Sequence, residues 1–378
     1  MKNKIPGVSI ISSALLFKLV IIHIFGTVFA YEIYGKISKL GDGYQPEYFE
    51  GFTGSIFNST YITHAIYYAI GSVLPGYLAP MLLGILIAIL IWKAFKDIYI
   101  FVNNKLFWIC NLFPHFLIWS GSSSKEQIVI ICGLIIIDFS VKYIFLKKNI
   151  NFEIILVIFS FFILFIIRPN YFLIYFTVFL STLLLRDLPQ FYKNLSINIF
   201  IILLLIFTIF IFSLFLLNQN FMEFYFNNWI KQVEQSFLIY AEAFSNRYEI
   251  IWYDIYSFLF NSIWGLPQGL IGPTLLEVIK KPIQIPVFLE GLVYLYILCY
   301  LNFKIFKICF ISNFLKYHLI LYLFVALIVL FISYPYLIFN PGSALRYKQS
   351  LHPILIFFPL LILANFREKT LDKKAKKD

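Results

Sequence analysis

The sequence predicts an all-α, polytopic integral membrane protein with about ten transmembrane helices. Its composition, its long apolar runs and the placement of its basic residues support this prediction. The chain of 378 residues is 61% hydrophobic and 20% aromatic, and only 13% of its residues are charged. A typical soluble domain is about 45–50% apolar and about 25% charged. A water-soluble surface needs more charge than this chain carries, and the apolar excess also excludes disorder. We expect residues 1–378 to form a single transmembrane domain.

The apolar segments give the number of spans, because a bilayer core about 30 Å thick needs roughly 20 apolar residues per helix. The first of them carries Lys18 and His23 and has no clear cleavage site, so we interpret it as a retained helix rather than a signal peptide. The third, fifth, sixth and tenth are short. The ten predicted spans are residues 8–30, 74–92, 106–119, 127–146, 154–167, 171–185, 196–217, 286–302, 318–339 and 351–366.

The basic residues predict how these spans are threaded. With both termini in the cytoplasm, eighteen of the 30 basic residues fall on the cytoplasmic side, as the positive-inside rule requires. The larger loops, 31–73 and 218–285, then lie on the side of the membrane opposite the cytoplasm. The second of them is rich in Trp and Tyr, which fit either interfacial helices or stacking on sugar rings.

The net charge of +11 therefore reflects topology, and we expect no nucleic-acid partner. The basic tail 367–378 is expected to lie against the anionic headgroups of the bilayer. The cytoplasmic loops contain no phosphate-binding or dinucleotide-binding glycine motif, so we expect no nucleotide and no organic cofactor. The four cysteines are scattered, without the spacing of a zinc site.

Four groups of polar residues on the side opposite the cytoplasm are candidates for function. The first is a carboxylate cluster, Asp42, Glu47 and Glu50, in the loop after the first span. Such carboxylates can take a proton from a sugar hydroxyl or hold a divalent cation. They are equally consistent with a solvated loop that needs charge to stay out of the bilayer.

The second and third candidates are tight turns. Residues 119–127 read Trp-Ser-Gly-Ser-Ser-Ser-Lys-Glu-Gln, and their serines are typical helix caps. Lys125 and Glu126, however, start a span, where charge is costly unless it is paired. The turn Arg168-Pro169-Asn170-Tyr171 lies between two short spans, so Arg168 needs an anionic partner. Its planar guanidinium suits a phosphate, and snorkelling to lipid phosphates is the alternative.

The fourth candidate is the segment 340–353 before the last span. Pro341 and Gly342 break the preceding helix there. Arg346, Tyr347, Lys348 and His352 follow, and the histidine directly precedes a proline at a helix start. A histidine at this position can titrate near neutral pH.

Together these features resemble known membrane glycosyltransferases. A first span followed by a long acidic loop is similar to the arrangement in GT-C-type enzymes. The W-S-G-S-S-S-K-E turn, the R-P-N turn and N-P-G-S-A-L-R-Y resemble multispan proteins of bacterial polysaccharide gene clusters, including Wzy-type O-antigen polymerases. The resemblance covers most of the chain, but only through short motifs.

The resemblance implies an enzyme of the bacterial inner membrane that joins sugars linked to undecaprenyl pyrophosphate at the periplasmic face, with a flippase and a chain-length regulator as partners. It implies that Arg168, Arg346, Lys348 and Lys125 bind the pyrophosphate, and that Asp42, Glu47 or His352 takes the proton. Supporting residues would be Glu50, Glu126, Asn170, Tyr171 and Tyr347. Polymerases of this family carry their key arginines in two large loops between middle spans, and this chain does not. The departure favours a GT-C enzyme that transfers a single sugar, and a lipid-linked oligosaccharide flippase is a further alternative.

Overall fold

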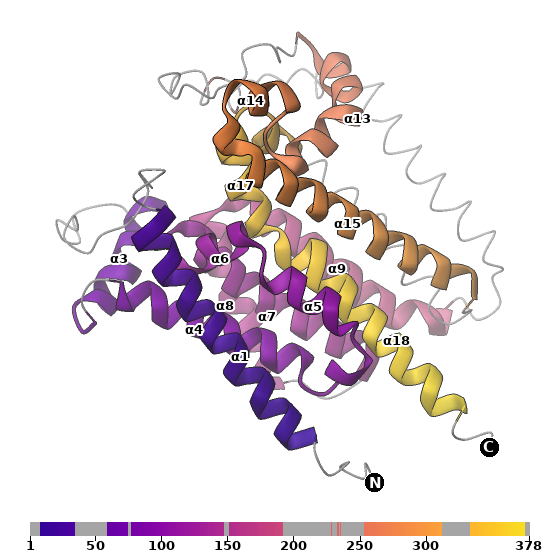
Figure 1. Cartoon of the computed structure of the whole chain (residues 1–378). Helices are drawn as coiled ribbons and strands as arrows, with labels where there is room; N and C mark the ends of the chain where they lie inside the picture. Colours follow the sequence, from indigo (N-terminus) through magenta and orange to yellow (C-terminus); the bar gives the residue numbers. More distant parts are fainter. Residues whose placement is uncertain are drawn as a thin grey trace. The chain divides into compact units, whose positions relative to one another are not determined.

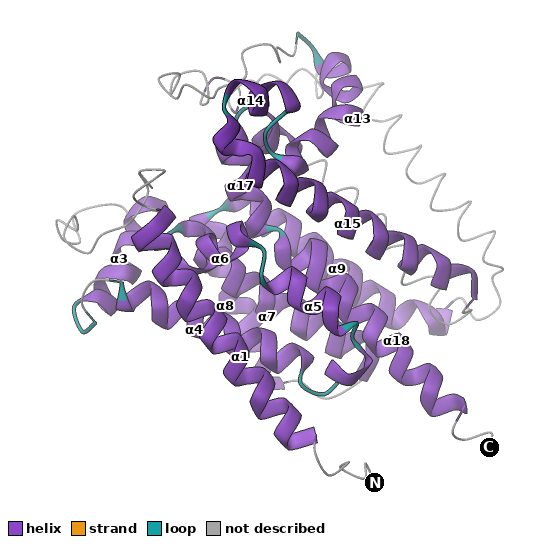
Figure 2. Cartoon of the chain, in the orientation of Figure 1, coloured by secondary structure: helices purple, strands orange, loops and turns teal. Residues whose placement is uncertain are grey.

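The computed structural model describes residues 8–34, 59–74, 77–146, 151–191, 253–311 and 333–374, together with 228, 233 and 235. In these residues the regular elements are all helices, joined by turns and short loops (Figure 2). The all-α prediction is confirmed for this part of the chain. The helices fall into two compact units, Met1–Phe179 with Gln349–Asp378 (unit 1) and Leu180–Lys348 (unit 2).

Unit 1 contains most of the described helices. α1 lies along α4 and α6 (Figure 1). A Cβ at Gly121 would lie 2.7 Å from the Thr27 Cα atom, so glycine permits this close approach of α6 to α1. The elements of unit 1 are α1 Val8–Val28, η1 Phe29–Tyr34, α3 Ser59–Gly71, α4 Leu78–Phe95, η3 Tyr99–Phe101, α5 Asn104–Asn111, α6 Pro114–Gly121, α7 Lys125–Leu146, α8 Asn151–Ile167, α9 Pro169–Phe191, η6 Pro353–Phe357 and α18 Phe358–Lys374, α9 continuing past Phe179 into unit 2.

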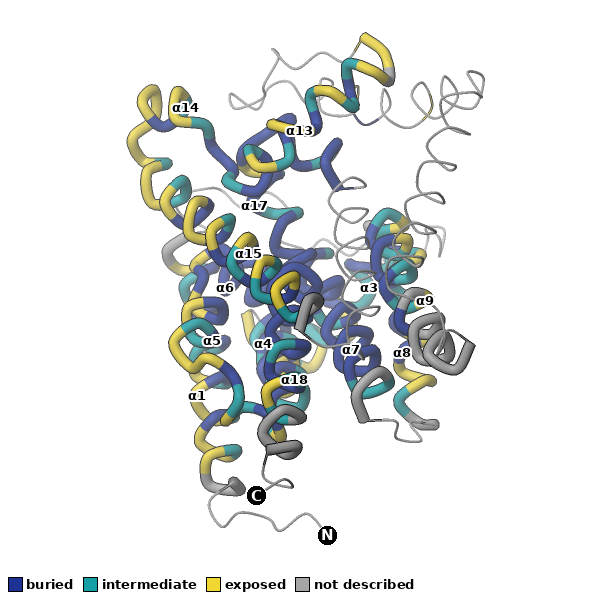
Figure 3. The backbone as a smooth tube through the Cα atoms, turned by 90° about the vertical axis from the view of Figure 1, so that its right-hand side faces the viewer, coloured by how far each residue is buried: buried dark blue, intermediate teal, exposed yellow. Residues whose placement is uncertain are grey.

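Three helical stretches are long and apolar enough to cross a membrane: Ile11–Glu32, Leu78–Phe95 and Pro282–Ile308. The pair Pro341–Ser350 and Pro353–Glu368, bent by 57°, would be a fourth. Large apolar side chains are also exposed on other helices, among them Ile158, Phe159 and Phe162 on α8. Figure 3 shows exposed segments, in yellow, along α1 and α15 as well. By their length and composition, these helices are compatible with a membrane protein. The count of ten spans stays a prediction, since 196–217 and most of 318–339 lie outside the described residues.

One predicted span differs from the structure, and another carries more charge than a lipid-exposed span would. Residues 106–119 are not one helix, because α5 ends at Asn111 and Pro114 starts α6. A proline inside a continuous helix would clash with the preceding turn, whereas it fits the first helical position. α7 is long, with 22 residues, but it carries four charged side chains (Lys125, Glu126, Asp138 and Lys142) that need partners within the protein.

Two of those charges belong to an ion-pair cluster that joins α4, α7 and α8. Lys142 Nζ lies 2.7 Å from Asp138 Oδ2 and 3.4 Å from Glu153 Oε1. Lys93 Nζ lies 2.9 Å from Glu153 Oε1. We call this end of unit 1 the Lys93 end. The opposite ends of the same helices, at Leu78, Lys125 and Ile167, form what we call the Lys125 end.

Unit 2 contains α13 Ile255–Ile271, α14 Leu275–Lys280, η5 Pro282–Gln284 and α15 Ile285–Ile311, followed by a helical stretch at 333–338 and by α17 Pro341–Ser350, whose last two residues belong to unit 1. Asp254 caps α13 by accepting from the Ser257 N–H at 2.7 Å. Gly272 ends α13 with a φ of 102°, which favours glycine. The described part of the predicted loop 218–285 is therefore helical.

Candidate functional site

The turn between α6 and α7 is fixed by two tyrosines from other elements. The Tyr31 hydroxyl accepts from the Ser123 N–H at 2.9 Å and lies 2.6 Å from Ser123 Oγ. The Tyr67 hydroxyl, on α3, accepts from the Ser124 N–H at 3.1 Å and donates to Gln127 Oε1 at 2.6 Å. Both contacts satisfy backbone groups at a buried helix start. The N-terminal turn of α7 is thus held between η1 and α3.

Side chains of the turn itself complete this network. Ser124 Oγ accepts from the Gln127 N–H at 3.3 Å, which is the capping contact predicted for these serines. The Gln127 amide donates to the carbonyls of Pro80 at 2.8 Å and Ser120 at 2.6 Å. Gln127 is fully buried. These hydrogen bonds replace the water that its polar atoms lose on burial.

Arg168 reaches the same turn from the break between α8 and α9. Pro169 starts α9, and the guanidinium Nη2 of Arg168 lies 2.8 Å from Glu126 Oε1. The Glu126 side chain is fully buried, and 22% of the Arg168 side chain is exposed. Glu126 is therefore an anionic partner for Arg168, and the expectation that charge at the start of α7 is paired is confirmed for this residue.

Lys125 adds a second positive charge beside this ion pair. The pKa of its ammonium is lowered from 10.5 to about 8, mainly by burial and also by the charge of Arg168, while the charge of Glu126 opposes both effects. The lysine stands at the first residue of α7, ahead of the predicted span 127–146. A half-buried cation with a depressed pKa is typical of a site that binds an anion or transfers a proton.

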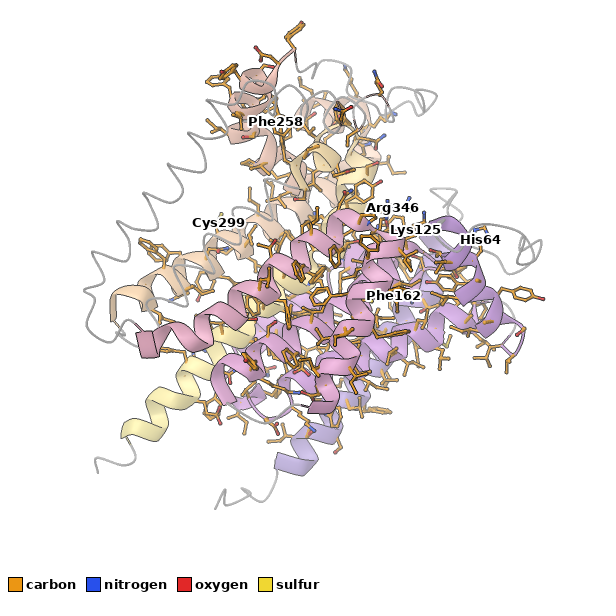
Figure 4. All side chains as sticks on the ribbon, turned by 180° about the vertical axis from the view of Figure 1, so that it is seen from behind. His64, Lys125, Phe162, Phe258, Cys299 and Arg346 are labelled. Atoms are coloured by element: carbon orange, nitrogen blue, oxygen red, sulfur yellow. The ribbon has the colours of Figure 1, made fainter. Side chains whose placement is uncertain are left out.

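His64 also belongs to this group, although the sequence did not identify it. It lies on α3, three residues before Tyr67, and side chains at this spacing share one face of a helix. His64 and Lys125 occupy the same region in Figure 4. Burial and the charge of Lys125 keep the pKa of His64 below its ordinary value of 6.5. The i, i+3 spacing of His64 and Tyr67 was the available signal, but it lay within a segment predicted to be a loop.

The other predicted residues of the Arg168 turn are in its immediate vicinity. Asn170 is half-buried in the first turn of α9. Tyr171 is buried, and its N–H donates to the Arg168 carbonyl at 2.9 Å. The structure thus brings together Lys125, Glu126, Arg168, Asn170 and Tyr171, which the sequence had placed in two separate turns.

His352 has a different environment. Its side chain is fully buried in unit 1, and its ring stacks on Phe116 with centroids 4.2 Å apart. Phe357 and Phe113 meet the same ring edge-on, at 4.8 and 6.0 Å. Such aromatic packing is typical of a core residue. Its predicted role as a proton acceptor stays a prediction.

The predicted cations of segment 340–353 lie in unit 2. Asn340 caps α17, since its Oδ1 accepts from the Gly342 N–H at 2.7 Å. Lys348 is fully buried; its Nζ donates to the Leu270 carbonyl at 2.9 Å and lies 4.7 Å from the Tyr294 ring centroid. It thereby satisfies the C-terminal end of α13. Arg346 is half-buried, with its guanidinium 5.9 Å from the Tyr347 ring centroid.

The remaining candidates, Asp42, Glu47 and Glu50, lie outside the described residues. Within the part of the chain that the structure describes, no group of three or more His, Cys, Asp or Glu side chains is arranged to hold a metal ion. No protein-family model, curated protein or solved structure matches the chain.

Proposed function

We propose that the chain is a membrane glycosyltransferase that acts on sugars linked to undecaprenyl pyrophosphate, and that it polymerises oligosaccharide repeat units. The observation that carries the proposal is the juxtaposition of Arg168 and Lys125 at one end of a helical bundle. The Arg168 guanidinium is held by Glu126 at 2.8 Å, and Lys125 stands beside it with a depressed pKa. Two oriented cations suit a pyrophosphate, whose charge grows as it departs.

In the proposed reaction, an acceptor hydroxyl attacks the anomeric carbon of the lipid-linked sugar. The bond between that carbon and the pyrophosphate oxygen breaks, and the electron pair leaves with the lipid pyrophosphate. Asp42 or Glu47 accepts the hydroxyl proton. Arg168 and Lys125 stabilise the departing charge, with Asn170 and Tyr171 as neighbours. The role of Arg346 at the pyrophosphate stays a prediction. The activated sugar supplies the energy, so the reaction uses no nucleotide.

The arrangement of helices supports the proposed topology. Gln127 at the start of α7 contacts Pro80 at the start of α4, whereas Asp138 and Lys142 further along α7 contact the far end of α4 and the start of α8. α4 and α7 therefore run in one direction and α8 in the other. This matches a threading in which the Lys125 end faces the periplasm and the Lys93 end faces the cytoplasm, with both chain termini cytoplasmic.

One observation favours a second candidate function, a lipid-linked oligosaccharide flippase. α17 and the helix that follows it pass the length and hydropathy test for a span only as a pair bent by 57°. Transporters often use such broken helices near their binding sites. The two functions predict different products, so one experiment separates them.

The test compares Arg168→Ala, Arg168→Lys and Lys280→Gln in a strain of the source bacterium that lacks the gene. Lys280 is exposed at the end of α14, so its replacement is a control for loss of one positive charge. We expect Arg168→Ala to lower the amount of long polymer by about 100-fold or more, and Arg168→Lys to lower it less. Single-repeat chains should accumulate, with the variant still inserted in the membrane.

Full polymer from Arg168→Ala would overturn the proposed mechanism. Absence of even single-repeat chains would support the flippase, because the repeat unit then fails to reach the periplasmic face. The alternative of a single-sugar transferase predicts chains that lack one sugar but keep their length distribution.

A further inference from the structure

We propose that His64 is a third residue of the phosphate site at the Lys125 end and that it takes up a proton when the anion binds. This inference deepens the proposed function, since it concerns the same site. It also extends the site to α3, an element that carries none of the residues predicted from the sequence.

The position of His64 follows from the anchoring of α3. Tyr67 contacts the backbone N–H of Ser124 at 3.1 Å and the side chain of Gln127 at 2.6 Å. His64 lies on the same helical face, one turn earlier. The face of α3 that carries His64 is therefore held against the first turn of α7, where Lys125 directly follows Ser124. Figure 4 shows His64 and Lys125 in this region.

The charged groups around His64 explain its state in the absence of a ligand. Lys125 and Arg168 are positive, and Glu126 pairs with Arg168. α4 and α8, which pack against α3, carry Lys93 and Glu153 at the Lys93 end, where they pair with each other. Burial and Lys125 together lower the pKa of His64. The imidazole is consequently neutral at pH 7.

A bound phosphate or pyrophosphate reverses this balance. Two or more negative charges between Lys125 and Arg168 would attract a proton to the nearby imidazole, since an opposite charge within about 4–6 Å favours the charged form. Protonated His64 then provides an N–H donor to the anion. Binding and protonation are linked, so each strengthens the other.

The experiment measures binding of inorganic pyrophosphate to the full-length protein in detergent by calorimetry at pH 7. Two buffers with different enthalpies of ionisation give the number of protons taken up. The variants are His64→Gln, His64→Lys and, as a control, Lys280→Gln. We expect the unaltered protein and the control to take up more protons than His64→Gln. Their affinity for pyrophosphate should also fall as the pH rises from 5.5 to 7.5. This decrease should exceed the decrease in His64→Gln by a factor of up to about ten for each pH unit.

His64→Lys keeps a positive charge, and we expect it to bind pyrophosphate without the additional proton. Equal proton uptake in the unaltered protein and in His64→Gln would overturn the proposal, as would loss of binding in both His64 variants. Pyrophosphate contains neither lipid nor sugar. If the protein bound it with the linked proton but formed no polymer, the proposed function would fail while the anion site remained.

Discussion

At the scale of single residues, the charge of Lys125 makes anion binding at the site depend on pH in the alkaline range. Its pKa of about 8 lies below the ordinary 10.5, mainly because burial disfavours the charged ammonium. The positive charge is therefore present below pH 8 and is lost as the pH rises through 8. We predict that pyrophosphate binding weakens between pH 7.5 and 9, and that a calorimetric titration detects this loss.

Two variants test the assignment of that pH dependence. Lys125→Arg keeps its charge throughout this range, so its binding should persist to pH 9. Lys125→Gln should bind several-fold more weakly at pH 7 and show little further loss up to pH 9. An unchanged pH profile in Lys125→Gln would assign the titration to another group. The His64 effect lies at a lower pH, which keeps the two titrations separate.

At the scale of elements, one tyrosine contacts the break between α17 and α18. Pro353 has no N–H, so the helix cannot continue its regular hydrogen bonds through this point. The Ile354 N–H donates to the Leu351 carbonyl at 3.0 Å rather than to that of Ser350. The Ser350 carbonyl accepts from the Tyr175 hydroxyl of α9 at 2.9 Å. Tyr175 reaches it across Gly133 of α7, where an added Cβ would lie 2.1 Å from the hydroxyl oxygen. These residues all belong to unit 1.

We predict that Tyr175→Phe lowers the free energy of unfolding by about 0.5–1.5 kcal/mol, because it removes one buried hydrogen bond but keeps the ring. Gly133→Ala should cost more, about 1–3 kcal/mol, because the tyrosine must move. Thermal unfolding in detergent measures both effects. Tyr296→Phe is the matched control, since Tyr296 on α15 is 69% exposed. Equal stability of the Tyr175 and Tyr296 variants would contradict the role given to Tyr175.

At the scale of the whole molecule, the sequence predicted the class of fold and the pairing of charges better than the boundaries of helices. Low charge and long apolar runs are sufficient for an all-α membrane protein. An isolated charge in a membrane is costly, so the sequence predicted that Glu126 has a charged partner. That prediction is confirmed by its ion pair with Arg168. The prediction of a single span at 106–119 was wrong. The apolar residues continue across Pro114, so the hydropathy of this segment gives no sign that the helix breaks there.

The composition of the candidate site was predictable only in part. Lys125 and Arg168 were identified because each is a charged residue in a turn between apolar runs. Their proximity depends on the packing of α7 against α8, which no local pattern encodes. Lys348 was predicted to bind the pyrophosphate, and this stays a prediction; the sequence did not indicate that its ammonium donates to the Leu270 carbonyl at the end of α13. His64 was missed because its helix, α3, lies within a stretch predicted to be a loop.

The threading of the chain can be tested at two exposed positions in unit 1. Val73 follows α3 and is 77% exposed, and Asn104 is exposed at the start of α5. Between them lies α4, whose 18 residues span about 27 Å at 1.5 Å per residue. This length is close to the thickness of a bilayer core. The two positions should therefore lie on opposite sides of the membrane.

We predict that a cysteine at position 73, in a protein whose four native cysteines are replaced by serine, reacts with a membrane-impermeant maleimide in intact spheroplasts. Asn104→Cys should react only after the membrane is permeabilised, because basic residues such as Lys93, Lys96 and Lys105 flank it and are retained in the cytoplasm. The opposite pattern would place the Lys125 end in the cytoplasm, where the proposed periplasmic sugar transfer does not occur. Labelling of both positions in intact spheroplasts would show that α4 does not cross the membrane.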